Sequence, residues 1–224
     1  MNSKILPIAI ICLSLCSCDS DILDTTPLSV SPTSLTLYVG DTYQLTVNKT
    51  KNITYSPIDS WYATVENSGL VTAKKTGKTR IKVSDGNSTI YVSVDVKSTY
   101  QLYPDMDYYI GKKFDVFDGA FGNYDNTSST DDYITYWYDH RTKYDISFGF
   151  IFKKGDAFGT IQAVSIYIPV TYEKQMQTYL WDRYFCPEVL NDVYYLYNHD
   201  NDVGLKLEYE SSQRAYNILY FPID

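Results

Sequence analysis

Few residues of this sequence have the types and spacing that catalysis requires. Paired carboxylates that could act as general acid and base occur at Asp131-Asp132 and at Asp200 and Asp202. Such pairs need contrasting environments, whereas both lie in polar turn clusters, where Asp and Asn bond the local backbone. The sequence has no glycine-rich phosphate loop, Gly-x-Ser-x-Gly or His-Glu-x-x-His motif. We therefore predict that the protein is not an enzyme and has no cofactor.

Metal binding is the second chemistry to consider. Residues 198–202, Asn-His-Asp-Asn-Asp, offer oxygen ligands for Ca²⁺, but they lack the glycine and the final acid of a helix–loop–helix calcium site. His140 and His199 lie at expected turns, and two histidines without thiolates are too few for a zinc site. We predict no metal, with calcium at Asp200 and Asp202 as the alternative.

Composition narrows the class of protein further. The chain has 224 residues, enough for one large domain or two of about 100 residues. With 27 Asp and Glu against 19 Lys and Arg, its charge is unsuited to a phosphate backbone, so nucleic acid is excluded as a partner. The 24 Tyr, 9 Phe and 3 Trp favour β-strands.

The amino terminus predicts a location. Residues 1–17 hold one Lys and an apolar run that is too short to span a bilayer but suits a secretory signal. The run ends in Leu15-Cys16-Ser17-Cys18, which resembles the lipobox of bacterial lipoproteins and implies a lipid anchor at Cys18 in the outer membrane. A buried N-terminal helix or a short membrane anchor is the alternative.

The linker at 18–27 is acidic directly after Cys18. This pattern resembles the export signal of Bacteroidetes-type surface lipoproteins and implies exposure at the cell surface, the alternative being a solvated linker. After cleavage and lipidation only Cys186 remains as a free thiol, so no internal disulfide can form. We expect Cys186 to be a small buried hydrophobic residue rather than a nucleophile.

Residues 28–97 have the period-two alternation of short strands, broken by Gly, Asn and Asp turns, that predicts an antiparallel β-sandwich. The segments 28–41, 63–73 and 77–83, with Gly-Leu-Val-Thr-Ala at 69–73, resemble the bacterial Ig-like domain, group 2. The resemblance implies a spacer or adhesive module, with Trp61 as its core aromatic.

Residues 100–224 form a second domain, which contains 19 of the 24 Tyr. Three of its segments recur in the same order, 136–140 with 195–199, 145–152 with 202–209, and 165–169 with 218–222. They predict a duplicated unit, 111–169 and 171–222, each a helix followed by three strands. The helices are expected at 112–121 and at 172–185, the second capped by Thr171 with Met176, Tyr179, Leu180 and Tyr184 on one face.

This order of elements resembles the β-lactamase-inhibitor-protein type of domain. The predicted fold class is thus an all-β Ig-like sandwich followed by an α+β domain, in which an antiparallel sheet has its helices on one face. Chance similarity between Tyr-rich strands is the alternative to duplication.

Strand alternation also predicts a binding face. Ile146, Phe148, Phe150 and Phe152 point to one side, as do Val203, Leu205, Leu207 and Tyr209, so this side should pack on the helices. The opposite side should be wet and shallow, with Trp137, Tyr167 and Tyr133 around it. The alternative is that Trp137 belongs to the core.

The predicted function is that of a surface-anchored, non-enzymatic module for binding or adhesion, whose partner is a glycan or a protein. The other candidate is a structural, assembly or inhibitor-like lipoprotein that docks to another protein at the outer membrane. Residues 24–97 and 100–224 are expected to fold independently, because a short polar linker separates them.

Overall fold

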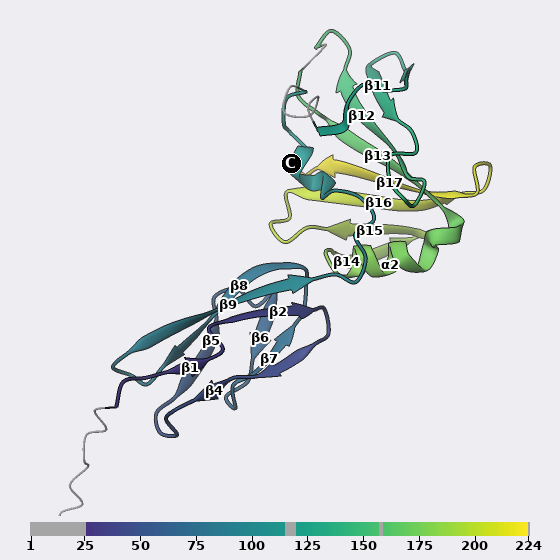
Figure 1. The fold of residues 1–224 in the computed structure, drawn as a ribbon. Coiled ribbons are helices and arrows are strands. Elements are labelled where there is room, and N and C mark those ends of the chain that lie inside the picture. The colour runs from purple at the N-terminus through teal and green to yellow at the C-terminus, as the bar shows by residue number, and fades with distance from the viewer. Residues whose placement is uncertain (1–25, 115–119, 157–158, 224) are drawn as a thin grey trace, which may run out of the picture.

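The computed structural model describes residues 26–114, 120–156 and 159–223, which form two domains joined after Lys97 (Figure 1). The predicted signal sequence at 1–17, Cys18 and most of the acidic linker lie outside the described residues. No helix in the described part is long and apolar enough to cross a membrane.

The first domain is built from three small sheets. Two strands pair as β1-β4, three as β3-β7-β6, and four as β2-β9-β8-β5, in which β2 and β9 are parallel. The strands are β1 Val30–Ser31, β2 Ser34–Tyr38, β3 Thr42–Gln44, β4 Thr46–Val47, β5 Thr54–Pro57, β6 Ala63–Val65, β7 Leu70–Ala73, β8 Gly77–Ser84 and β9 Thr89–Lys97.

Strict alternation of side chains holds this sandwich together. Along β8 the residues Thr79, Ile81 and Val83 are buried, while Lys78, Arg80 and Lys82 between them are exposed. Val92, Val94 and Val96 of β9 face the same core. Because a strand presents alternate residues to opposite sides, the apolar set lines the space between the sheets. The predicted Ig-like sandwich is confirmed.

The second domain is one antiparallel sheet of eight strands in the order β10-β11-β12-β13-β17-β16-β15-β14. Its elements are η1 Met106–Tyr109, β10 Asn126–Ser129, β11 Tyr133–Tyr138, β12 Ser147–Lys153, β13 Ala163–Pro169, η2 Val170–Tyr172, α2 Glu173–Trp181, β14 Phe185–Leu190, β15 Val193–Tyr197, β16 Val203–Glu210 and β17 Ala215–Pro222.

This sheet consists of two consecutive four-stranded meanders, β10 to β13 and β14 to β17, which join where β13 pairs with β17. The three recurring sequence segments fall on β11 and β15, β12 and β16, and β13 and β17, the same position in each meander. Each unit has four strands rather than the three expected, because the polar β10 and the Pro-containing β14 lack clear alternation. That the units arose by duplication stays a prediction.

One side of the sheet forms the core of this domain. Phe148, Phe150 and Phe152 of β12 are at most 1% exposed, and Ile146 just before the strand is fully buried. Leu205 and Leu207 of β16 lie on the same side. The expectation for Tyr209 is wrong, because this side chain lies beyond the covered part of the strand, packs on Tyr216 and is 49% exposed.

The helix α2 covers this side. Met176, Tyr179 and Leu180 of α2, and Tyr184 just after it, are buried as predicted. The helix is shorter than expected, because Thr171 lies in the 3-10 turn η2 rather than at a cap, and Phe185 already begins β14. The α+β fold, with its helices on one side of the sheet, is confirmed.

The first predicted helix, at 112–121, lies partly outside the described residues. Its beginning is not helical, since Lys113 forms a β-bridge with Thr160. Phe114 is buried against Tyr136 and Phe152, so the aromatic expected on a helix face enters the core from a turn just after this bridge.

Candidate functional site

The side of the sheet away from α2 holds a shallow depression of about 360 Å³ over the first meander. Strands β10 to β13 form its floor, and the β16–β17 hairpin contributes one residue to its edge. We call it the aromatic depression, and it is lined by Asn126, Ser128, Trp137, Asp139, Ser147, Tyr167 and Gln213.

Trp137 lies over Gly149 on the floor of the aromatic depression. Gly149 is its partner across the β11–β12 pair, and a Cβ added to Gly149 would lie 2.8 Å from indole atoms Cε3 and Cζ3. Glycine therefore permits the close approach of ring and backbone. The indole Nε1 donates a hydrogen bond to Ser128 Oγ at 2.8 Å, which fixes the orientation of the ring.

Tyr167 forms the second aromatic wall. Its ring centroid lies 5.7 Å from that of Trp137, with the planes tilted by 45°. Asn217 Nδ2 donates to the Tyr167 hydroxyl at 3.4 Å, and Asn217 Oδ1 accepts a bond from Ser165. Burial and the nearby carboxylates of Glu210 and Glu208 raise the pKa of Tyr167, so the hydroxyl stays protonated.

Of the three predicted ligand-binding residues, the structure brings two together. Trp137 and Tyr167 are both half-buried and line the depression, so Trp137 is not part of the core cluster. Tyr133 points to the same side of β11 but lies four residues away, roughly 13 Å along the strand. It is 43% exposed and does not line the depression.

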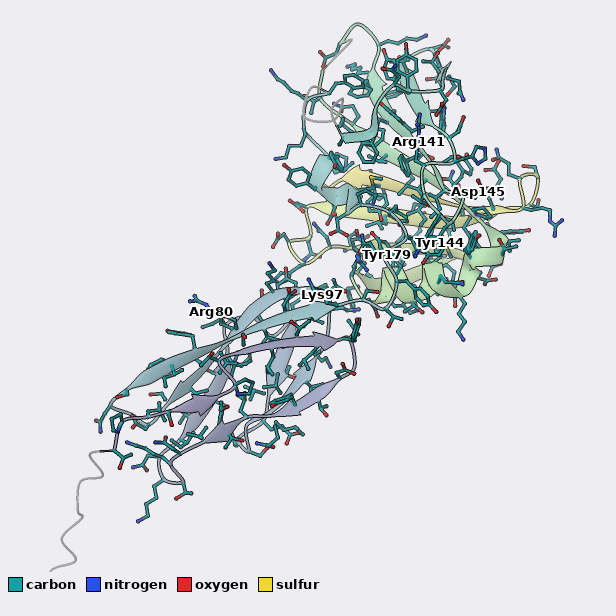
Figure 2. The ribbon with its side chains drawn as sticks, in the orientation of Figure 1. Arg80, Lys97, Arg141, Tyr144, Asp145 and Tyr179 are labelled. Carbon is teal, nitrogen blue, oxygen red and sulfur yellow. The ribbon has the colours of Figure 1, made fainter. Side chains whose placement is uncertain are left out.

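The loop between β11 and β12 borders the same site, and its Arg141 and Asp145 are labelled in Figure 2. Arg141 Nη2 donates to Asp125 Oδ2 at 2.7 Å and to the Asn123 carbonyl. His140 Nδ1 lies 2.5 Å from Asp145 Oδ1 in an exposed bend, as expected of a turn histidine.

A second site, which the sequence did not predict, lies where the two domains meet. Lys75 of the first domain extends Nζ to the main-chain carbonyls of Trp181 and Tyr184, at the end of α2. A cation is favoured there because the last carbonyls of a helix lack partners within it. Thr76 N donates to Asp182 O at 2.7 Å, and Ser98 Oγ donates to Asp182 Oδ2 at 2.6 Å.

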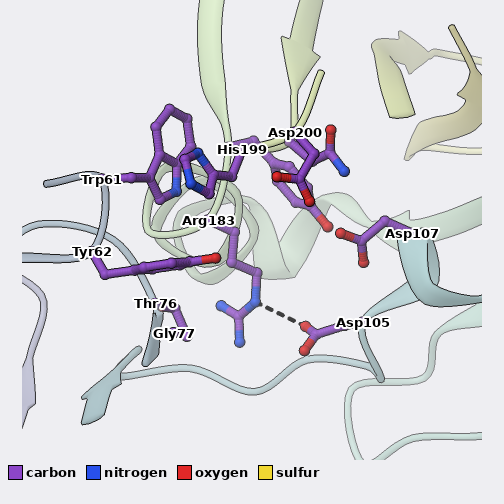
Figure 3. Close-up of a pocket in the computed structure, with 11 residues that line it drawn as sticks. Trp61, Tyr62, Thr76, Gly77, Asp105, Asp107, Arg183, His199 and Asp200 are labelled. Carbon is purple, nitrogen blue, oxygen red and sulfur yellow. Dashed lines mark hydrogen bonds and ion pairs between the residues drawn. The ribbon is translucent and has the colours of Figure 1, made fainter. Parts of the chain in front are cut away.

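Trp61 also belongs to this junction, and its expected place in the core of the Ig-like domain is wrong. The indole stacks on the ring of His199 from the second domain, with centroids 5.0 Å apart and planes 20° from parallel (Figure 3). His199 Nε2 lies 2.7 Å from Asp59 Oδ2, and Tyr62 meets the imidazole edge-on. His199 thus connects the domains.

Behind these contacts lies a polar cavity of about 200 Å³. Arg183 enters it and donates from Nε to Asp105 at 3.1 Å (Figure 3). The guanidinium also lies 3.8 Å from the centre of the Tyr179 ring. Burial, and then the nearby charge of Asp105, raise the pKa of Asp107 to about 6.

The junction therefore holds domains together. Arg183 also donates to the Gln101 side chain and the Tyr179 carbonyl, so each of its three guanidinium nitrogens bonds a group within the protein. No group of three or more His, Cys, Asp or Glu in the described part of the chain could hold a metal ion.

The other residues that were considered for catalysis or metal binding stabilise local structure. Asn198 binds Asp202 through Nδ2 at 2.6 Å, and its Oδ1 accepts the main-chain amides of Asp202 and Val203, which closes the loop considered for calcium. Asp131 and Asp132 lie in the exposed hairpin between β10 and β11. Cys186 is half-buried beside the core, and its thiol donates to Glu188 O at 3.5 Å.

Comparison with known families identifies the class of the first domain. Residues 24–96 match the family model of the bacterial Ig-like domain (group 2). This confirms the resemblance drawn from the Gly-Leu-Val-Thr-Ala segment and its neighbouring strands. No curated protein matches the sequence.

Individual solved structures are only distantly similar. Domains 4 and 5 of the S-layer protein SbsC are 23% identical over 31% of this chain and 50% of theirs, with a TM-score of 0.27. A cysteine-rich secretory protein from Staphylococcus aureus is 11% identical over 56% of this chain and 48% of its own, with a TM-score of 0.30. Domains 5–6 of SbsC are 14% identical over 88% of this chain and 83% of theirs, with a TM-score of 0.28.

The chain thus spans about half the length of the first two of these structures. TM-scores this low support no argument about function. The similarity of the second domain to the β-lactamase-inhibitor-protein type stays a prediction.

Proposed function

We propose that this protein is a non-enzymatic, surface-anchored binding module that uses the aromatic depression to bind a glycan. The observation that supports it most directly is Trp137, whose indole packs over Gly149, is held by a hydrogen bond to Ser128 and lines the depression. Rigid aromatic rings beside polar groups suit both the apolar face and the hydroxyls of a sugar.

The site has the remaining parts that sugar binding needs. Gln213, Asn126 and Asp139 place amide and carboxylate groups around the rings, so donors and acceptors are available to hydroxyl groups. Ser147 is the small residue of the lining, and a larger side chain at its place would fill part of the floor.

In this proposal the Ig-like domain is the spacer and Cys18 carries the lipid that holds the protein in the outer membrane at the cell surface. The support is the lipobox-like sequence before Cys18 and the acidic residues after it. Palmitate labelling that persists in Cys18→Ala would overturn the anchor. Full protection of the protein from protease added to intact cells would overturn surface display.

Glycan binding is tested with Trp137→Ala and Tyr167→Ala on polysaccharide arrays. Each should weaken binding at least ten-fold, about 1.4 kcal/mol, with little change in melting temperature. Tyr209→Ala is the matched control, since this tyrosine is 49% exposed on the other side of the sheet. Unfolding of the Trp137 or Tyr167 variant, or unchanged binding, would refute the assigned site.

A second candidate function, docking to another protein, is favoured by the edge strand β14. Phe185, Val189 and Leu190 of this strand are each at least 50% exposed, and β14 ends the sheet, so one side of its backbone has no neighbouring strand among the described residues. Val189→Lys should abolish capture of a protein partner from intact cells while leaving glycan binding unchanged. If Val189→Lys still captured the protein partner and lost glycan binding instead, this function would be ruled out.

A further inference from the structure

The charges around the aromatic depression indicate which sugars it accepts. Asp139 is the charged residue of the lining, and none of the described residues that line the depression is a cation. Its Oδ2 accepts one bond from Asn126 Nδ2, at 2.6 Å. An ionised carboxylate has about four acceptor positions, so Asp139 can still accept hydroxyl donors from a ligand.

The opposite wall is acidic as well. Asn217, which bonds the Tyr167 hydroxyl, is paired across the β16–β17 ladder with Glu208, so Glu208 faces the same side of the sheet, and Glu210 follows two residues later on that side. The charges of both carboxylates act on the Tyr167 hydroxyl. Lys206 on the same strand is paired with Glu208 at 2.8 Å, so its charge is compensated locally. Carboxylates therefore lie at both ends of the aromatic surface.

The cations of the surrounding loops do not reverse this sign. Arg141 is held by Asp125 and the Asn123 carbonyl, which compensates its charge at the border of the site. Arg214 follows Gln213 in the β16–β17 hairpin and is exposed to solvent, where screening weakens its effect.

We propose that the aromatic depression selects neutral or amino-bearing pyranosides and rejects carboxylated ones. A carboxylate on a sugar stacked on Trp137 would face Asp139 on one side and the acidic residues of β16 beyond Tyr167 on the other, and like charges at such sites repel. An amino group at the same place would be attracted. This inference rests on the proposed glycan binding and specifies the ligand class of that site.

The test uses alginate, polygalacturonate and hyaluronate, each before and after chemical reduction of its carboxyl groups, together with neutral polysaccharides. Reduction removes the charge and keeps the chain, so the pair isolates the electrostatic effect. We expect the full-length protein to bind the reduced form of a recognised polymer at least ten-fold more tightly than the unreduced form. The difference should shrink at high salt.

Two variants of equal charge change locate the effect. Asp139→Asn should narrow the difference several-fold, whereas Glu188→Gln, on the same side of the sheet in the second meander, should leave it unchanged. Equal binding of reduced and unreduced polymers would overturn the selectivity while leaving glycan binding intact. The selectivity would also be overturned if the protein bound the unreduced polymers and Arg214→Ala abolished that binding. Binding to none of the polymers would overturn the proposed function itself.

Discussion

Gly149→Ala tests whether the position of the Trp137 ring matters, without removing any functional group. The new Cβ would lie 2.7 Å from Thr135 Cγ2 and 2.8 Å from indole carbons, whereas ordinary contacts are 3.4–4 Å. The ring must therefore shift by roughly 0.6–1 Å, and because Trp137 is half-buried and lines an open depression it can move away from the sheet. The backbone at Gly149 has no positive φ, so alanine adds no backbone strain.

The expected energies follow from these distances. Overpacking costs about 1–3 kcal/mol in a closed core, and the open side of the indole places this case at the low end. Alanine recovers about 0.4–1 kcal/mol by restricting the unfolded chain. The net loss of stability should be below about 1 kcal/mol, a fall in melting temperature of at most about 2–4 °C for a chain of this size. Glycan affinity should nevertheless fall at least ten-fold.

The structure offers a closely matched control for this experiment. Gly204 of β16 lies under the Phe221 ring on the same side of the sheet, and a Cβ there would lie 2.7 Å from Cε2 and Cζ. Gly204→Ala should cost similar stability and leave glycan binding unchanged. Calorimetric melting and titration of both variants give the comparison. Unchanged affinity in Gly149→Ala, or an equal loss in both variants, would refute the role of the indole as a flat surface.

Three further predictions concern the domain junction and the core. Lys75→Ala should cost about 1–3 kcal/mol of stability through the loss of two charge-assisted hydrogen bonds, and it should speed proteolysis of the 98–99 linker. Lys74 is its exposed neighbour, and Lys74→Ala should have neither effect. Equal cleavage of both variants would argue against the contact. Because burial raises the pKa of Asp107 to about 6, the folded state binds the proton more strongly than the unfolded state, so stability falls as pH rises from about 4 through 6. Asp107→Asn should therefore raise the melting temperature at pH 7 and not at pH 4. An equal rise at both pH values would contradict this. Burial also raises the pKa of Tyr103 and Tyr220 far above the ordinary value, so the unfolded chain loses these protons at a lower pH than the folded protein does. Stability should therefore fall steeply above pH 10, which melting followed by circular dichroism can measure. A melting temperature that stays constant up to pH 12 would be inconsistent with this burial.

Much of the fold could be predicted from local patterns. The alternation in β12 and β16 placed Phe148, Phe150 and Leu205 on the covered side of the sheet, because successive side chains of a strand point to opposite faces. The same rule put Trp137 and Tyr167 on the open side. The apolar spacing of Met176, Tyr179 and Leu180 identified the buried face of α2, since residues three and four apart share one face of a helix.

Predictions failed where the local pattern was weak. β10 is entirely polar and exposed, and β14 contains a proline and a register shift at Phe185 and Glu188, so neither has the periodicity of a half-buried strand. Tyr209 continues the apolar alternation of β16, but it lies beyond the part of the sheet that α2 covers and is 49% exposed. Alternation gives the direction of a side chain, and only the neighbouring elements determine whether that side is covered.

Local residue patterns are sufficient to predict the Ig-like domain, the two faces of the second sheet and the pair of aromatic residues on its open face, because each depends on residues close together in the chain. Only the tertiary structure decided that Trp61 leaves the core of its own domain to stack on His199, whose bond to Asp59 spans 140 positions of sequence. It also decided that Lys75 caps α2 from the other domain and that Gly149 forms the floor beneath Trp137. These contacts depend on how the two domains dock and how strands pair, and no periodicity within either segment specifies that geometry.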